Sequence, residues 1–164
     1  MSADEAAYRE YVTHRMDGLR RTAYLLCGDW HTADDLVSAA LVKLLRHWRR
    51  VSAMEAPDAY VRRMLLRAWL DERRRPWRRE HVTAALPDRA VRSADPTDRL
   101  HVLALLAELP PRRRAVLVLR YFCDLSVEET AAALDCSEGT VKSQTARALD
   151  SLRARLTGVP GMEE

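Results

Sequence analysis

Apolar residues recur with the 3.6-residue period of an α-helix along most of the chain, and this periodicity most restricts its fold. It is most regular over residues 33–48, where every turn supplies apolar side chains: Ala33, Leu36, Val37, Ala40, Leu41, Leu44, Leu45 and Trp48. Another stripe runs from Tyr8 to Leu26 and stops at Gly28, a residue that commonly ends helices. No segment shows the apolar and polar alternation of a strand, so the sequence predicts an all-α fold.

Two features mark the expected start of the second helix. Thr32 is followed three residues later by Asp35, which suggests a variant of the capping box. Asp34 and Asp35 are adjacent, but neighbouring helical residues point about 100° apart and do not easily share a metal ion. Close to a helix N-terminus, these carboxylates are instead expected to interact favourably with the positive end of the helix dipole.

A polar break from Val51 to Pro57 precedes a third helix, which is expected from Asp58. Its outward face is cationic, because Arg63, Arg67 and Arg74 lie within about 40° of one another on a helical wheel. The opposite, buried face is predicted to comprise Val61, Met64, Leu65, Ala68 and Trp69.

Positive charge is concentrated around this helix. Residues 59–80 hold eight arginines and three acidic side chains, a net charge of +5, whereas residues 1–58 carry −1 and the whole chain +3. The planar guanidinium suits phosphate oxygens, and the nearby rings of Tyr60, Trp69 and Trp77 could stack on unpaired bases. The alternatives are a solvated surface or arginine-rich codon usage, and Trp69 is expected to pack in the core.

Residues 81–97 contain two prolines and no sustained period, which indicates a flexible linker. The chain of 164 residues then divides into two small helical domains, at 1–80 and 98–157. A 17-residue linker extends to about 55–60 Å, comparable with roughly 16 base pairs of DNA.

The second domain is expected to begin with two short helices separated by Pro110 and Pro111, since proline can open a helix but not continue one. The apolar positions of the first are Leu100, Leu103, Leu106 and Ala107. Those of the second are Ala115, Val116, Leu119 and Phe122.

The last two helices have the layout of a helix-turn-helix. Ser126 and Glu129 form a capping box for a helix ending at Leu134, and after a short turn Ser137 caps a helix that runs to about Leu156. With Val141 facing inward, the other side of this helix and its flanks carry mostly small, hydrogen-bonding residues: Thr140, Lys142, Ser143, Gln144, Ala146 and Arg147. The alternative is an ordinary helical hairpin with a solvated face.

Signatures of enzymes and of metal or cofactor sites are missing from the sequence. Cys27, Cys123 and Cys136 lack metal-ligand spacing and are expected to be reduced thiols, and the five histidines show no ligand spacing either. There is no glycine-rich phosphate loop and no nucleophile elbow. The acidic N-terminal segment and the absence of a long apolar run predict a cytoplasmic protein with no membrane insertion.

At this point the residues resemble a known family. The segments that carry the likeness are DDLV (34–37), AYVRRMLLRAWLDERRR (59–75), LPPRRRAVLVLRYF (109–122) and SVEETAAALDCSEGTVKSQTARALDSLR (126–153). Together they resemble the extracytoplasmic-function, or group IV, sigma factors of the sigma-70 superfamily, of actinobacterial type. Such proteins contain sigma domain 2 and sigma domain 4 only, which would correspond to residues 1–80 and 98–157.

This resemblance implies a non-enzymatic subunit that binds core RNA polymerase, directs it to promoter DNA and helps to open the strands. It places core binding at Asp34, Asp35, Leu36 and Ser38. Recognition of the −10 element would involve the loop from Val51 to Ala56 and, in the helix that follows, Tyr60, Arg62, Arg63, Arg67 and Arg74. The −35 element would be read by Thr140, Lys142, Ser143, Gln144, Ala146 and Arg147. The resemblance also implies a protein partner, an anti-sigma factor that covers domains 2 and 4.

The chain departs from the family pattern at a few positions. Ser38 and Ala39 replace the usual Gln and acidic residue, and Arg67 stands where Asn is common. Asp135 replaces the turn glycine and Thr145 an apolar residue.

Two other functions remain open from the sequence. The segment from Glu138 to Leu149 alone also resembles the helix-turn-helix of LuxR-type regulators, which would bind duplex DNA without replacing the housekeeping sigma factor. An all-helical nucleic-acid enzyme that uses Asp34 and Asp35 would show metal-dependent turnover.

Overall fold

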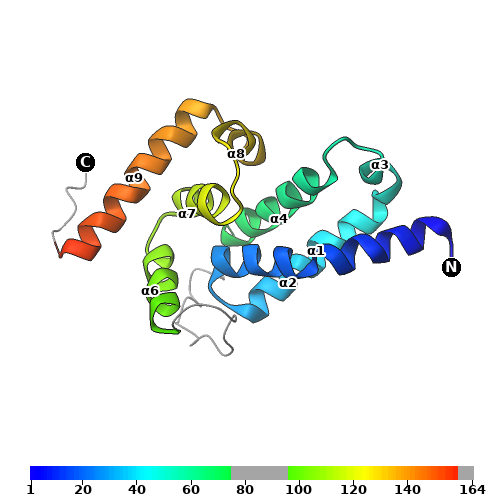
Figure 1. Ribbon diagram of the computed structural model, residues 1–164, viewed down its shortest axis with the longest axis horizontal. Coiled ribbons are helices and arrows are strands. Elements are labelled where there is room, and N and C mark those ends of the chain that lie inside the picture. Colours follow the sequence, from blue (N-terminus) through cyan, green and yellow to red (C-terminus); the bar gives the residue numbers. More distant parts are fainter. Residues whose placement is uncertain (75–95, 159–164) are drawn as a thin grey trace. The chain divides into compact units, whose positions relative to one another are not determined.

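The computed structural model describes residues 1–74 and 96–158, and the chain divides into two compact units, Met1–Pro87 and Asp88–Glu164. Every regular element in the described ranges is helical (Figure 1), so the all-α prediction is confirmed. Residues 81–95 of the expected linker, together with Arg75 and Trp77, lie outside the described residues.

The first unit contains α1 (Ala3–Cys27), α2 (Trp30–Arg46), α3 (Trp48–Ser52) and α4 (Pro57–Arg73). Helix α1 starts earlier than its apolar stripe because the Ser2 side chain caps it, accepting a hydrogen bond from the Glu5 backbone N–H. The helix ends where predicted, at Gly28, whose φ of 78° is left-handed. Helices α1, α2 and α4 pack on one another and form the core of this unit.

The predicted cap of α2 at Thr32 is wrong. Asp29 is the N-cap, and its carboxylate accepts hydrogen bonds from the Thr32 backbone N–H at 2.9 Å and the Thr32 hydroxyl at 2.7 Å. Burial opposes ionisation of Asp29, but these bonds and one from the His31 N–H hold its pKa below the usual value. The first turn of α2 therefore contains no acidic residue, and Asp34 and Asp35 lie beyond it.

The apolar stripe of residues 33–48 is buried except at Leu45, which is 53% exposed. The stripe does not belong to one helix, because α2 ends at Arg46 and Trp48 begins α3. Trp48 then packs against the rings of Tyr8 and Tyr11, at centroid distances of 5.6 and 5.3 Å. Val51 is also fully buried in α3, so the prediction of a polar break at that residue is wrong.

Helix α4 begins with Pro57 at its first position, one residue before the predicted start. Val61, Leu65 and Trp69 are buried as predicted, and Trp69 is a core residue. Met64 and Ala68 are only half-buried. Leu66 is buried although the predicted face omits it, because α4 packs against both α1 and α2 and needs a broader apolar surface.

The second unit contains α6 (Pro96–Ala107), α7 (Pro111–Leu117), the π-helical turn η1 (Val118–Phe122), α8 (Val127–Leu134) and α9 (Glu138–Thr157). Pro111 opens α7 as predicted. The core is built mainly from α7 and η1, together with facing residues of the other helices and of the loops on either side of α7 and η1: Leu106, Leu109, Ala115, Val116, Leu117, Val118, Leu119, Leu125, Ala131, Leu134, Val141 and Ala148.

Three residues expected on apolar faces of this unit are exposed, namely Leu100, Ala107 and Phe122. At Phe122 the reason is the π-helical turn. Its backbone is closed by a hydrogen bond from the Cys123 N–H to the Val118 carbonyl at 3.0 Å, five residues back, which shifts the helical period by one residue. Phe122 and its neighbour Tyr121 consequently face solvent, at 52% and 56% exposure.

Candidate functional site

The helix-turn-helix of the second unit forms through the caps that the sequence predicts. Ser126 and Glu129 exchange both hydrogen bonds of a capping box at the start of α8. Asp135 then takes the left-handed conformation, with φ of 55°, and donates its backbone N–H to the Ala131 carbonyl. Aspartate tolerates this conformation better than most residues, which explains how it replaces a turn glycine. Ser137 caps α9 by accepting a hydrogen bond from the Thr140 N–H.

Helix α9 presents the outward face that the sequence predicts. Val141 and Ala148 are fully buried against the unit. Thr140 and Gln144 lie half-buried at the edges of the outward face, and the remaining predicted contacts are exposed: Lys142, Ser143, Ala146 and Arg147. A face with polar and cationic groups near the N-terminal end of a second helix has the chemistry needed to contact base edges and phosphates in a major groove.

Arg113 is an additional residue at this face that sequence reasoning missed. It lies in the first turn of α7, and its Nε donates a hydrogen bond to Gln144 Oε1 over 3.2 Å. The bond fixes the Gln144 side-chain amide and leaves its NH₂ group for a further acceptor. The run of three arginines after Pro111 was a signal of positive charge, but only the fold shows which one reaches α9.

The cationic face predicted for α4 is present in part, because Arg63 does not share the exposure of Arg67 and Arg74. Arg67 and Arg74 are exposed, whereas Arg62 and Arg63 are half-buried beside the core of the unit. The guanidinium of Arg73 lies 5.7 Å from the centre of the Trp69 ring. Because Trp69 is buried, the aromatic residue of α4 that could meet a base is Tyr60, in the first turn and half-buried.

The loop between α3 and α4 lies close to Tyr60 in the chain. Val51, at its predicted start, belongs to the core, while Ala53, Glu55 and Ala56 are exposed and Met54 is half-buried. The exposed part of the proposed loop is therefore residues 53–56.

Arg50 contacts Tyr60 directly, and sequence reasoning missed this pair. Its Nη2 donates a hydrogen bond to the Tyr60 hydroxyl over 2.8 Å, and its guanidinium carbon lies 5.6 Å from the ring centre. Arg50 belongs to α3, before the segment whose charge the sequence singled out. The contact joins the end of one helix to the start of the next.

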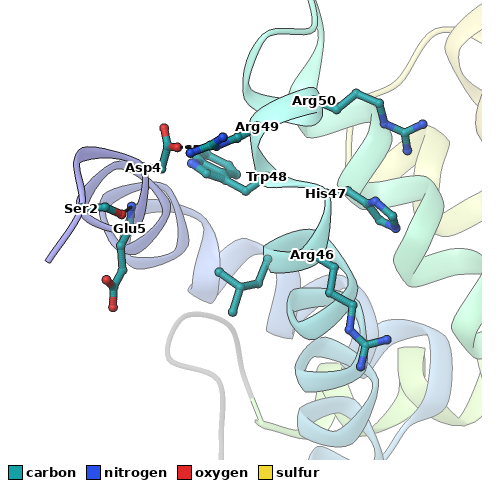
Figure 2. Close-up of a pocket in the computed structure, with 9 residues that line it drawn as sticks. Ser2, Asp4, Glu5, Arg46, His47, Trp48, Arg49 and Arg50 are labelled. Atoms are coloured by element: carbon teal, nitrogen blue, oxygen red, sulfur yellow. Dashed lines mark hydrogen bonds and ion pairs between the residues drawn. The ribbon is translucent and has the colours of Figure 1, made fainter.

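A groove of about 700 Å³ lies beside Arg50, between the first turn of α1 and the end of α2 (Figure 2). Asp4 and Arg49 close part of it with an ion pair of 2.7 Å. The side chains of Arg46, His47 and Arg50 extend to the other side, away from α1. The groove is lined by Ser2, Asp4, Glu5, Leu45, Arg46, His47, Trp48, Arg49 and Arg50.

The outward face of α2 combines acidic and apolar residues. Asp34, Asp35 and Ser38 are exposed, whereas Leu36 is only 3% exposed and belongs to the core. A partner that binds this face would therefore touch the three polar residues, with Leu36 supporting them from beneath. Val42 and Leu45 are both 53% exposed, and the helical period places them on the same face as Ser38. Exposed apolar side chains among charges are typical of a protein-binding surface.

Asp34 is held by a neighbouring arginine. Arg20 Nε donates to its carboxylate over 2.6 Å, and Nη2 makes a longer bond of 3.3 Å. The same guanidinium lies 5.1 Å from the centre of the Trp30 ring, which stacks on Tyr24 at 4.0 Å. Asp35 has no ion-pair partner among the described residues.

Within residues 1–74 and 96–158, no group of three or more His, Cys, Asp or Glu side chains is placed to hold a metal ion. In the same ranges, no helix is both long and apolar enough to cross a bilayer.

Comparison with known families gives two matches that together cover most of the chain. Residues 11–79 match the family described as Sigma-70 region 2, and residues 99–152 match Sigma-70, region 4. The first contains α2 and α4, and the second contains the helix-turn-helix.

Individual proteins are similar over nearly the same span. The RNA polymerase sigma-E factor of Streptomyces avermitilis is 39% identical over 151 residues, which cover 91% of this chain and 84% of that protein. The ECF RNA polymerase sigma factor SigM of Mycobacterium tuberculosis is 31% identical over 164 residues, with coverage of 98% and 81%.

Solved structures share the fold. The sigma factor RpoE of Bartonella quintana, in complex with the anti-sigma factor NepR, matches with a TM-score of 0.73 at 22% identity and covers 94% of this chain and 99% of its own. CnrH in complex with the cytosolic domain of CnrY matches with a TM-score of 0.68 at 23% identity, covering 94% and 90%.

Proposed function

Because the chain belongs to the extracytoplasmic-function sigma factors of the sigma-70 superfamily, of actinobacterial type, it directs RNA polymerase to promoters, and we propose how its two units divide this work. Residues 1–80, within the first unit, bind core polymerase and the −10 element as sigma domain 2. Residues 98–157, within the second unit, bind the −35 element as sigma domain 4. Residues 81–97 serve as the tether between them.

One observation carries this proposal: the same chain contains both a helix-turn-helix, in which α8 and α9 are each capped, and a helix, α2, whose outward face is acidic and apolar. Helix α9 reads the −35 element through its predicted contacts, Thr140, Lys142, Ser143, Gln144, Ala146 and Arg147. Arg147 and Lys142 are long and exposed, so they reach furthest from the helix. Arg113 assists by orienting Gln144.

In the first unit, the exposed α3–α4 loop and Tyr60 hold an unpaired base of the −10 element, and the arginines of α4 bind phosphates. Arg67 and Arg74 are exposed enough for direct contacts, while Arg62 and Arg63 contribute mainly charge from half-buried positions. This division of roles supports strand opening, because a base that is held outside the stack cannot re-pair.

Core polymerase binds the outward face of α2, where Asp34, Asp35 and Ser38 supply polar contacts and Val42 and Leu45 supply apolar area. Leu36 contributes by packing, since it is buried. The chain acts in the cytoplasm and performs no catalytic step of its own. An anti-sigma factor that covers both units would keep it from the polymerase.

Run-off transcription with purified actinobacterial core polymerase tests the function. Promoter-specific transcripts should appear only when the protein is added, and their absence across candidate promoters would contradict the assignment. A pull-down separates the alternative of a LuxR-type regulator, which predicts duplex binding without a stable complex with core polymerase. That alternative is not favoured, because residues 11–79 match Sigma-70 region 2.

A further inference from the structure

We propose that Arg50 of α3 is part of the DNA-binding surface, where it positions the Tyr60 ring and binds a phosphate of the unpaired strand. This inference rests on the proposed role of Tyr60 in −10 recognition. It adds a residue that lies outside both regions from which the nucleic-acid contacts of this unit were predicted, the loop from Val51 to Ala56 and the arginine-rich segment 59–80.

Arg50 and Tyr60 are in direct contact. Arg50 donates one hydrogen bond to the Tyr60 hydroxyl over 2.8 Å and lies 5.6 Å from the ring centre. These two interactions restrain the ring at the start of α4, next to the exposed loop residues 53–56. A ring with a fixed orientation loses less entropy when it meets a base.

Most of the N–H donors of Arg50 remain available to a ligand. A guanidinium has five N–H donors, and the Tyr60 hydroxyl accepts from one of them. Arg50 is exposed, and no carboxylate among the described residues forms an ion pair with it. Its neighbour Arg49 differs, because its Nε is paired with Asp4 at 2.7 Å.

The surface around Arg50 is rich in basic side chains. Arg46, His47 and Arg50 are exposed and extend to the same side, away from the acidic first turn of α1 (Figure 2). Helix α4 adds the exposed Arg67 and Arg74 to the charge of this unit. A guanidinium that lies beside an aromatic ring and has no carboxylate partner suits one nucleotide, with a phosphate for the cation and a base for the ring.

Arg49 provides a matched control for the experiment, since it is the adjacent arginine of the same helix. The probe is a fluorescent single strand with the non-template −10 sequence of a promoter that the wild-type protein transcribes. It is titrated into holoenzyme assembled with wild-type, Arg50→Ala, Arg50→Gln, Arg49→Ala or Tyr60→Phe protein, at several salt concentrations. Circular dichroism checks the folding of each variant.

We expect Arg50→Ala to weaken binding by about tenfold, as for a lost hydrogen bond to a charged group. The slope of log affinity against log salt should fall by about 0.7, the value for one single-strand phosphate. Arg50→Gln retains a donor for the Tyr60 hydroxyl and should show the same fall in slope. Tyr60→Phe should weaken binding without changing the slope, and Arg49→Ala should resemble the wild type.

An unchanged salt slope for Arg50→Ala, or equal losses for Arg50→Ala and Arg49→Ala, would overturn the inference. So would a loss of core-polymerase binding in place of DNA binding, since Arg50 would then contact a protein. Failure of the wild-type protein to direct any transcript would instead contradict the proposed function, so the two failures are distinguishable.

Discussion

Arg20 and Asp34 form an ion pair of 2.6 Å on the outward face of the first unit, and the Arg20 guanidinium also lies over the Trp30 ring. Asp34 and Asp35 are adjacent in sequence and are both proposed to bind core polymerase, but they therefore differ in whether their charge is paired. The charge of Asp34 is already matched within the chain, whereas Asp35 has no ion-pair partner among the described residues.

We predict that Asp35→Ala weakens core-polymerase binding by about 1 kcal/mol, and that Asp34→Ala has a smaller effect. When Arg20 is replaced by Ala, Asp34 becomes available and Asp34→Ala should cost as much as Asp35→Ala. Titration of labelled core polymerase with the single and double variants measures these differences. Equal losses in the presence of Arg20 would show that the ion pair does not mask Asp34.

Substitutions at Leu36 and Val42 should distinguish an effect on folding from an effect on polymerase binding. Leu36→Ala creates a cavity in the core and should lower the free energy of unfolding by about 2–5 kcal/mol. Val42→Ala, at an exposed position, should change stability by less than about 0.5 kcal/mol and still weaken polymerase binding. Urea unfolding followed by tryptophan fluorescence reports on the first unit, because all four tryptophans lie within residues 30–77. A stable Leu36→Ala variant would contradict its burial.

The Arg113–Gln144 contact predicts a change of base preference. Glutamine reads adenine with both its carbonyl oxygen and its NH₂ group, but here Arg113 already donates to one of the two lone pairs of the oxygen and competes for it. Arg113→Ala should therefore increase the preference for adenine at the base pair that Gln144 contacts. Binding of the protein to a set of −35 variants measures this preference, and an unchanged profile would contradict it.

Arg147→Ala serves as the comparison for that experiment. It should cost about 1–3 kcal/mol at a single −35 position if Arg147 contacts a base edge. An equal loss on every sequence would instead assign Arg147 to a phosphate.

Asp58 should make the first unit less stable in acid. Burial disfavours its charged form, but hydrogen bonds from Tyr11 at 2.6 Å and Arg15 at 2.9 Å hold the pKa of Asp58 below its usual value. A carboxyl with a depressed folded pKa stabilises the fold above its unfolded pKa, and this contribution disappears as pH falls through the folded value.

The urea midpoint of the wild-type protein should therefore decrease as pH is lowered from about 5 to 3, more steeply than that of Asp58→Asn. Tyr11→Phe removes one of the two hydrogen bonds and should lie between them. Identical pH profiles for the wild type and Asp58→Asn would show that this network does not contribute to stability.

Local signals in the sequence predicted much of the fold. Ser126, Glu129 and Ser137 act through hydrogen bonds to backbone groups three residues away, so their roles could be identified from spacing alone. The outward face of α9 followed from the period of the helix for the same reason.

Features that depend on distant contacts or on unusual backbone geometry could not be predicted in this way. Asp29 rather than Thr32 caps α2 because the left-handed Gly28 turns the chain just before it. Leu45 belongs to the apolar stripe by spacing, but none of the described helices covers it, and it is 53% exposed. The contacts of Arg50 with Tyr60 and of Arg113 with Gln144 join separate helices, and a one-dimensional pattern does not contain them.

The π-helical turn of residues 118–122 has a consequence for how the second unit tolerates change. It inserts one residue into an otherwise continuous helix. As a result, Val118 and Leu119 are buried and Phe122 is exposed. A deletion of a single residue there would restore the ordinary period and turn the residues that follow it in this helix by about 100° around the helix axis. The path by which the chain enters the helix-turn-helix therefore depends on one extra residue in a helical turn that precedes that motif.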